Sequence, residues 1–380
     1  MADYFQGSMG TKTLNQDRRV IDIEEQIMML DPNRSPFLLL TKKAGKNSRY
    51  NPKFHWQEDE HMEQTSTYEG STETGTQETT IEVGDVELFV EGDVILVPAT
   101  DEYMVVTDVK VSDDDIDVER GALGSTEANL TNEDELIIIG DASEEGAGGR
   151  DINMRKVSTP WNYMQIFKLP WGMTNTMQKQ KTYGPDEWAR LGRKKSAEFK
   201  ERIERAFLFG ERYKDETGDQ PKRYTRGIEK WITTNVEDKG GSSLTEDAFD
   251  AWCRDHAFAH GSDRKALLAS ADLISKISGW AKDNIKTRTP ENTYGINVQE
   301  YTTPFGVLDI VRHKMFTGDT YGKFGIAVDT EVLGYEYLRD TKLETNIQKN
   351  DEDQRKDQYI AEVGLKVGQE KRNAIIKNWE

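Results

Sequence analysis

The chain has 380 residues, of which 31% are charged, and its formal net charge is −19 at pH 7. This length predicts two or three domains with room for a sizeable core. The negative charge excludes a protein that grips nucleic acid or an anionic membrane through phosphates, because like charges repel. Cys253 is the only cysteine, which excludes an internal disulfide and a cysteine-based zinc site. No apolar run reaches the ~18–20 residues of a membrane helix and the N-terminus has no signal pattern, so we expect a protein that is made in a cytoplasm and stays soluble.

Residues 1–49 predict an N-terminal arm that is polar except for two short apolar segments. In the first segment, four aliphatic side chains recur at helical spacing: Val20, Ile23, Ile27 and Leu30. Asp31-Pro32 ends this segment, and Ser35 and Pro36 suit the N-cap and first position of a second short helix that carries Phe37. An apolar segment on a polar arm needs a surface to pack on, which is either its own core or a neighbouring chain.

Residues 50–79 and 147–168 predict an extended loop and its flanking strands. Phe54 and Trp56 alternate with polar residues as in a strand, whereas residues 57–77 are polar and predict a projecting loop. Apolar β structure resumes at Trp161.

Residues 80–146 predict an inserted β-rich module, either a small barrel or a sandwich. Short strand patterns are separated there by turn signals such as Gly92-Asp93 and Ser112-Asp113. From Glu58 to Glu145 the sequence holds 27 Asp and Glu against two basic residues, Lys110 and Arg120. That stretch carries −25, so the rest of the chain is net positive by six. The pattern indicates an acidic module inserted into a mildly basic body.

The longest periodic stretch predicts one helix over residues 185–213, about 43 Å long at ~1.5 Å per residue. Pro185 suits its first position, and Asp186 and Glu187 place negative charge at the positive end of the helix dipole. Its apolar residues fall in one row: Trp188, Leu191, Phe199, Ile203 and Phe207. On the opposite side Glu198 precedes Arg202, and Glu201 precedes Arg205, by the four residues that favour ion pairs. We expect a half-exposed rod that lies on a sheet.

The remaining segments predict how the main body is divided. The long helix belongs to a domain of residues 169–226, to which residues 326–380 return as strands. Residues 227–325 alternate between helical and strand patterns and predict a separate α/β domain.

No residue pattern predicts catalysis, a cofactor or a metal site. His55 and His61 are six residues apart, too far to share one ion easily on a strand. Asp113, Asp115 and Asp117 alternate like the start of a calcium loop, but the Gly and Glu that such a loop needs are absent. An acidic hairpin turn is favoured there, with weak Ca²⁺ or Mg²⁺ binding left open. One further predicted helix carries acidic and imidazole groups with no accompanying nucleophile: Asp250, Asp255, His256 and His260.

Several stretches match a known family when they are taken together and in order. They are Asp22–Ile27, Leu30–Pro32 and Ser35–Leu38 in the arm, Val118–Gly121 and Gly140–Gly146 in the insert, and then Asn162–Phe167, Glu204–Arg212 and Thr225–Ile228. In these stretches the chain resembles the major capsid proteins of tailed phages with the HK97 fold, most closely the SU10-like major head proteins.

The resemblance implies an α+β fold of the HK97 type, with the arm, the extended loop, a peripheral domain built on the spine helix of residues 185–213 and an axial domain. It implies a major capsid protein without enzyme activity or cofactor, which self-assembles as hexamers and pentamers into an icosahedral shell around double-stranded DNA. The implied location is the virion, after synthesis in the cytoplasm of a bacterial host. Implied partners are the portal, a separate scaffolding protein and a decoration protein. The candidate inter-subunit contacts are Ile23, Ile27, Leu30, Phe37, Phe54, Trp56 and Tyr68.

Two other functions stay open from the sequence. One is a phage tail or baseplate protein whose β module binds a ligand such as a carbohydrate. Residues 80–140 hold only Phe89 and Tyr103 as aromatic residues, which weakens this alternative because sugar sites usually stack on aromatic rings. The other is a metal-dependent hydrolase that uses the acidic run with His55 and His61, and the ligand spacing disfavours it.

Overall fold

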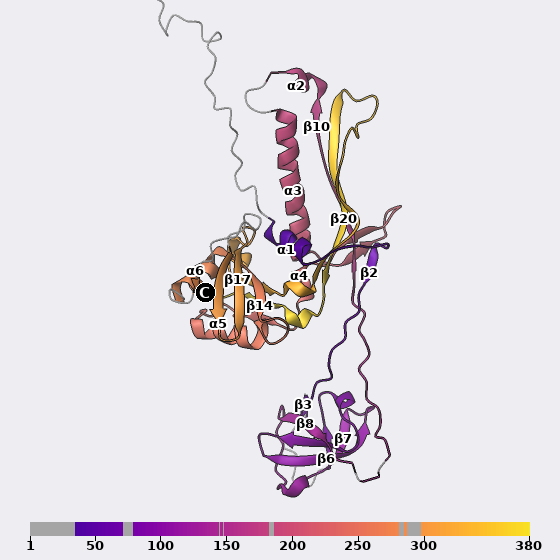
Figure 1. Cartoon of the computed structure of the whole chain (residues 1–380), viewed down its shortest axis with the longest axis vertical. Helices are drawn as coiled ribbons and strands as arrows, with labels where there is room; N and C mark the ends of the chain where they lie inside the picture. Colours follow the sequence, from indigo (N-terminus) through magenta and orange to yellow (C-terminus); the bar gives the residue numbers. More distant parts are fainter. Residues whose placement is uncertain are drawn as a thin grey trace, which may run out of the picture. The chain divides into compact units, whose positions relative to one another are not determined.

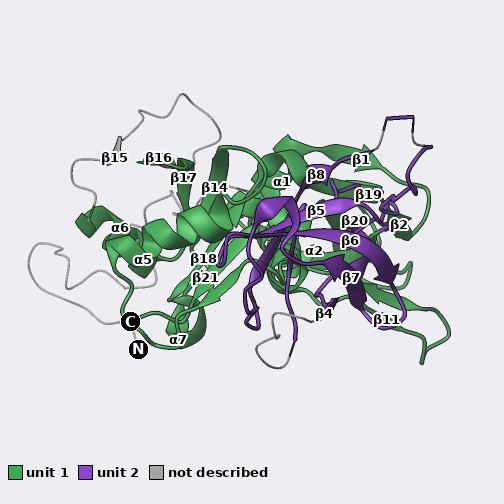
Figure 2. Cartoon of the chain, turned by 90° about the horizontal axis from the view of Figure 1, so that it is seen from below, with its two compact units in different colours: residues 1–56, 160–380 green, residues 57–159 purple. Residues whose placement is uncertain are grey.

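The computed structural model describes residues 35–70, 79–143, 145–146, 148–181, 186–280, 285–286 and 298–380. The chain divides into two compact units (Figure 2). Residues 1–56 and 160–380 form the first unit, called the body below, and residues 57–159 form the second, called the barrel unit. No helix of the described residues is long and apolar enough to cross a membrane.

The first sheet of the body carries the long helix. Its strands lie in the order β1-β19-β20-β10, with β1 parallel to β19 and the other pairs antiparallel. Their bounds are Lys46–Ser48 for β1, Leu333–Glu344 for β19, Gln354–Val367 for β20 and Gln165–Thr174 for β10. Alternate residues of β10, among them Phe167 and Leu169, are buried in the same core as Phe199 and Phe207 of the helix α3. Figure 1 shows α3 running beside β10 and β20.

The long helix α3 spans Glu187–Phe209, four residues shorter at its C-terminal end than the sequence predicts. Asp186 is its N-cap and accepts a hydrogen bond from Trp188 N at 3.2 Å, while Pro185 lies outside the described residues. A Cβ atom on Gly210 would lie 2.5 Å from the carbonyl oxygen of Thr225, so the chain passes too close there for any other residue. The predicted residues up to Tyr213 instead enter a hairpin of β11 (Tyr213–Asp215) and β12 (Lys222–Tyr224).

The second sheet of the body has seven strands in the order β13-β21-β18-β14-β17-β16-β15. The bounds are Val236–Asp238 for β13, Arg264–Ala269 for β14, Ile285–Lys286 for β15, Val298–Thr303 for β16, Gly306–Arg312 for β17, Phe324–Val328 for β18 and Ala374–Lys377 for β21. The helices α5 (Glu246–Trp252) and α6 (Ala271–Trp280) contribute Phe249, Trp252 and Leu273 to its core. Cys253 is buried in this core, as its apolar neighbours in the sequence suggest.

Shorter elements complete the body. They are α1 (Pro36–Ala44), the strand pair β2 (Lys53–His55) and β9 (Trp161–Tyr163), α2 (Asn175–Lys179), α4 (Ile228–Trp231) and α7 (Gly318–Tyr321). The predicted start of α1 is correct, with Ser35 at the N-cap position and Pro36 first in the helix.

The barrel unit is a closed barrel of six antiparallel strands. Their order is β3-β8-β5-β6-β7-β4, and the bounds are Thr65–Thr67 for β3, Thr80–Glu82 for β4, Asp93–Val97 for β5, Glu102–Lys110 for β6, Asp115–Glu119 for β7 and Glu135–Asp141 for β8. A bridge between Tyr68 and Val83 joins the two ends of the sheet, with Gly84 N donating to Thr67 O at 2.9 Å. The unit includes more residues than the predicted module of residues 80–146. Its strand β3 and the buried Tyr68 fall in the stretch that the sequence predicts to be a projecting loop. The polar sequence of β3 does not predict a strand.

Candidate assembly surfaces

The first helix after the arm is capped by a side chain from the spine helix. Ser35 makes no side-chain hydrogen bond to the start of α1. Instead, the buried carboxylate of Glu204 on α3 accepts a hydrogen bond from Phe37 N at 2.8 Å and another from Leu38 N at 2.5 Å. His313 Nε2, just after β17, lies 2.9 Å from Glu204 Oε1. One carboxylate therefore ties together α1, α3 and the end of β17.

Burial dominates the electrostatics of this junction. It raises the pKa of Glu204 above its ordinary value of 4.5, and His313 and the two backbone N–H groups offset that rise only in part. The carboxylate also lies at the positive end of the α1 dipole. The sequence analysis missed both Glu204 and His313. The available signal was a glutamate between Ile203 and Leu208 on the apolar side of an amphipathic helix.

A second cluster holds the base of the extended loop. Asn162 Nδ2, in β9, donates to Thr225 Oγ1 at 3.1 Å and to Leu365 O at 2.7 Å. Asn162 Oδ1 accepts from Arg226 N at 2.9 Å. Two of the stretches that carry the family resemblance, Asn162–Phe167 and Thr225–Ile228, are therefore in direct contact.

Aromatic rings surround this base. Trp56 lies 5.3 Å from Trp231 and 5.8 Å from Phe54, measured between ring centroids. The guanidinium of Arg212 lies 3.8 Å from the ring centroid of Trp161, within cation–π range. These contacts fix the β2–β9 pair to the rest of the body.

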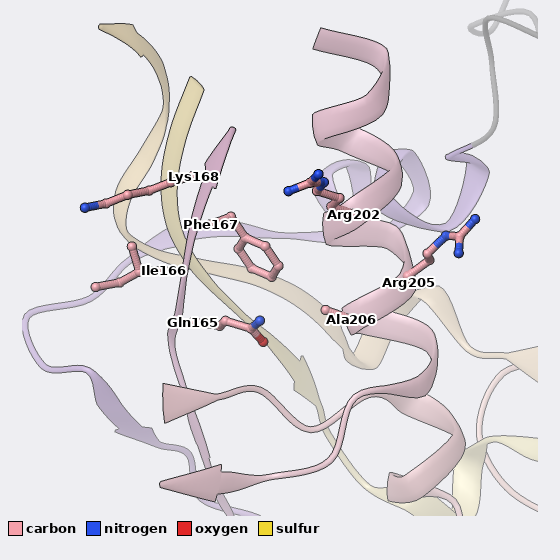
Figure 3. Close-up of a pocket in the computed structure, with 7 residues that line it drawn as sticks. All are labelled: Gln165, Ile166, Phe167, Lys168, Arg202, Arg205 and Ala206. Carbon is pink, nitrogen blue, oxygen red and sulfur yellow. The ribbon is translucent and has the colours of Figure 1, made fainter. Parts of the chain in front are cut away.

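A third surface is a hollow of about 360 Å³ between β10 and α3 (Figure 3). Phe167 points from β10 toward the helix, and Arg202 reaches from the helix toward β10. Ile166 and Lys168 point to the other side of the strand. Only one of the two predicted ion pairs on α3 forms: Arg205 binds Glu201 at 2.8 Å, but Glu198 binds Lys195 at 2.6 Å instead of Arg202. The prediction for Glu198 and Arg202 is wrong because Lys195 reaches the same carboxylate.

The barrel unit contains its own buried ion pair. Arg120 donates to both carboxylate oxygens of Glu102 at 2.7 Å, and Glu102 also accepts from Gly121 N and Ala128 N. The guanidinium and these N–H groups outweigh the effect of burial, so the pKa of Glu102 lies below 4.5. The pair fixes the loop after β7, where Leu123 is 73% exposed and has a φ of +55°.

The predicted inter-subunit contacts fall into two groups. Ile23, Ile27 and Leu30 lie outside the described residues. Phe37, Phe54, Trp56 and Tyr68 are buried inside their own chain, with 0%, 3%, 7% and 4% of their surface exposed. Each packs in a core of its own unit. Their role as contacts to a neighbour stays a prediction.

The described residues hold no group of three His, Cys, Asp or Glu side chains suited to a metal ion. Asp117 accepts hydrogen bonds from Lys110 and Thr80, and Asp115 and Asp117 lie in β7 of a hairpin. In the other acidic cluster, Asp255 pairs with Arg254 at 2.7 Å and His256 lies 3.4 Å from Glu237. Asp117 and Asp255 are therefore each paired with a basic side chain of their own unit.

A family model described as SU10 major capsid protein matches residues 6–380. The chain belongs to the SU10 major capsid protein family. It is therefore a phage major capsid protein and a component of the virion. This membership decides against the alternative of a tail or baseplate protein. No curated protein matches the chain.

Solved structures show that this SU10-family protein has an HK97-like capsid fold. The capsid of a native GTA particle is 9% identical, with a TM-score of 0.52 over 96% of this chain and 97% of the other. A structure from Mycobacterium phage Bobi is 6% identical, with a TM-score of 0.50 over 96% of this chain and 97% of the other. At such identities the likeness concerns the fold alone.

Proposed function

We propose that this capsid protein assembles through rings of six and five copies into a closed icosahedral shell around double-stranded DNA, and that it has no enzymatic role. The match of the family model over residues 6–380 carries this proposal, because it includes both the body and the barrel unit. Contacts between rotationally related copies close into rings when each copy offers two different surfaces.

The body offers apolar surface for such contacts. The exposed side chains include Tyr213 at 60% and Tyr224 at 41%, which face each other across the β11–β12 hairpin, and Tyr50 at 93%. Burial of such groups contributes about 25 cal/mol per Å², partly offset by lost rigid-body freedom. Modest contacts suffice because a shell repeats each of them many times.

The anchored start of α1 supports a role for the arm. Glu204 and His313 fix Phe37 and Leu38, so the start of α1, which follows the arm in the sequence, is held at a defined point of the body. We propose that Ile23, Ile27 and Leu30 pack against another copy. The extended loop, with Phe54 and Trp56 at its base, would lie over a neighbour.

The distribution of charge between the two units supports a role as a container for DNA. The barrel unit has 28 Asp and Glu against five Lys and Arg, a net charge of −23, so the body carries +4. Such a subunit encloses DNA without binding particular sequences. A portal, a separate scaffolding protein and a decoration protein are the further partners that we propose, with synthesis in the cytoplasm of the host.

The test is assembly of the purified chain. Light scattering gives the particle mass, and negative-stain images of the same fractions show shells, tubes or rings of five or six copies. The assay is run with and without the scaffolding protein of the same phage. A chain that stays monomeric under both conditions contradicts the proposal.

A further inference from the structure

The strand β10 forms the outer edge of its sheet. Among the described strands it pairs with β20 alone, over all ten residues from Gln165 to Thr174. An edge strand has unpaired backbone N–H and C=O groups and is often covered by another segment. Pro170 blocks only one position, and Ile166, on this strand, is 46% exposed. This edge is therefore suited to contact with a partner.

Two cations beside β10 lack an ion-pair partner within the described part of the chain. Lys168 lies on β10 and Arg202 on α3, and both are exposed. Their neighbours Lys195 and Arg205 do form ion pairs. Arg202 and Lys168 lie on either side of the strand, with Ile166 next to Lys168 (Figure 3). We call these three residues the β10 edge patch: it presents one guanidinium, one ammonium group and one aliphatic side chain.

The barrel unit carries a turn with the complementary chemistry. Residues 111–114 connect β6 and β7, and Val111 is 57% exposed. Asp113 and Asp114 follow it, both exposed and with no cation paired to them among the described residues. The nearest cation on this hairpin, Lys110, is bound to Asp117 at 2.7 Å. We call residues 111–114 the hairpin tip: it presents one aliphatic side chain and two carboxylates.

We propose that the hairpin tip of one copy docks on the β10 edge patch of a second copy. The inference rests on the proposed function, which requires contacts between copies. Each copy would offer one tip and receive another, the head-to-tail arrangement that closes into rings. The opposite net charges of the two units, −23 and +4, favour this pairing over contact between two barrel units.

Charge reversal with rescue tests the assignment. One variant carries Lys168→Glu with Arg202→Glu, a second carries Asp113→Lys with Asp114→Lys, and a third combines all four changes. A matched control reverses Arg193 and Lys194, two exposed cations of α3 that do not line the hollow. All of these side chains are exposed, so the fold should persist, and circular dichroism checks it.

Each double variant should raise the concentration needed for half-assembly by about tenfold, one decade in the association constant. The combined variant should return to within about threefold of the original chain, and the control should not change. Salt near 1 M, where the Debye length is about 3 Å, should weaken assembly of the original chain but have less effect on the double variants. Double variants that assemble like the original chain, or a combined variant no better than either, would overturn the proposal.

Cross-linking tests the same contact without requiring shells. Arg202→Cys is placed in one chain and Asp114→Cys in another chain with a tag of different size, and the mixture is oxidised mildly. Cys253 is buried and does not compete. Disulfide-linked heterodimers support docking between copies, whereas their absence overturns it. If shells fail to form but heterodimers appear, the proposed function is wrong and the docking contact stands.

Discussion

The body and the barrel unit each contain a completely buried glutamate whose pKa is shifted, and the two shifts have opposite directions. Glu102 in the barrel faces the guanidinium of Arg120, and its pKa is lowered. Glu204 in the body faces the imidazole of His313, and burial raises its pKa. Each carboxylate also accepts two backbone N–H bonds.

The opposite shifts have two causes. Burial raises the pKa of Glu204 by more than His313 and the N–H groups lower it, whereas burial raises the pKa of Glu102 by less than Arg120 and the N–H groups lower it. Arginine keeps its charge at every relevant pH and binds both oxygens in a planar fork. A histidine is charged only when it is protonated, and His313 contacts one oxygen of Glu204. The barrel therefore pairs its carboxylate with a cation that does not lose its charge, whereas the junction at α1 has a cation only when His313 is protonated.

The largest expected effect comes from Glu204→Ala. It leaves His313 and the N–H groups of Phe37 and Leu38 without their buried acceptor, so the body should lose about 3–5 kcal/mol of unfolding free energy. All eight tryptophans lie in the body, so urea unfolding followed by tryptophan fluorescence reports on this unit. Glu201→Ala on the wet side of α3 is the control and should have a much smaller effect. A Glu204→Ala loss no larger than the control would contradict the capping role.

The matching change in the barrel is Arg120→Met. It leaves Glu102 buried without its cation and should destabilise the barrel by about 3 kcal/mol. Hydrogen exchange of peptides from residues 57–159 should accelerate, while tryptophan-detected unfolding of the body should stay as it was. Equal losses in both units would show that the barrel does not fold as an independent unit.

The contributions of Glu102 and Glu204 to stability should change with pH in opposite directions. The lowered pKa of Glu102 means that its contribution to stability is present above 4.5 and is lost as pH falls through its folded pKa. The raised pKa of Glu204 means that its contribution is present below 4.5 and is lost as pH rises through its folded pKa. For each unit, the unfolding free energy of the original chain and of its Glu→Gln variant is measured over a pH series that brackets 4.5. The slope of their difference against pH gives the sign. Slopes of the same sign would refute the assignment.

The smallest expected effect is that of salt. Screening should stabilise the barrel unit, with its net charge of −23, by about 1 kcal/mol, the scale of surface electrostatic effects. The nearly balanced body should change less. Hydrogen exchange of both units at low and high salt gives the two values, and a larger gain in the body would contradict the electrostatic picture.

Much of the fold could be predicted because it depends on local patterns. The α3 helix follows from its apolar row, the start of α1 from Ser35-Pro36, and the barrel strands from alternating residues bounded by turns. The predictions are wrong where a contact between residues far apart in the sequence determines the local structure. The end of α3 depends on the approach of Thr225 to Gly210, and β3 depends on pairing with β8.

The candidate surfaces were less predictable for the same reason. Glu204 and His313 are 109 residues apart, and nothing local links them. The resemblance places Phe37 in the arm and Phe54, Trp56 and Tyr68 in the extended loop, but large apolar side chains in such segments equally mark cores, and all four are buried within their own unit. That Arg202 has no ion-pair partner among the described residues could not be predicted, because its expected partner Glu198 binds Lys195 instead.

The two crossings between the units also make a defined insertion point for protein engineering. Glu58 and Ser158 exchange backbone hydrogen bonds of 3.0 and 2.9 Å, and Trp56 N donates to Pro160 O at 3.1 Å. The chain therefore leaves and re-enters the body on adjacent antiparallel strands, whose paired Cα atoms lie about 5 Å apart. A guest domain whose termini are equally close could replace residues 57–159 and leave the Trp56–Pro160 pair in place. Such a chain lacks the hairpin tip, so its assembly would report the contacts that the body makes without the barrel unit.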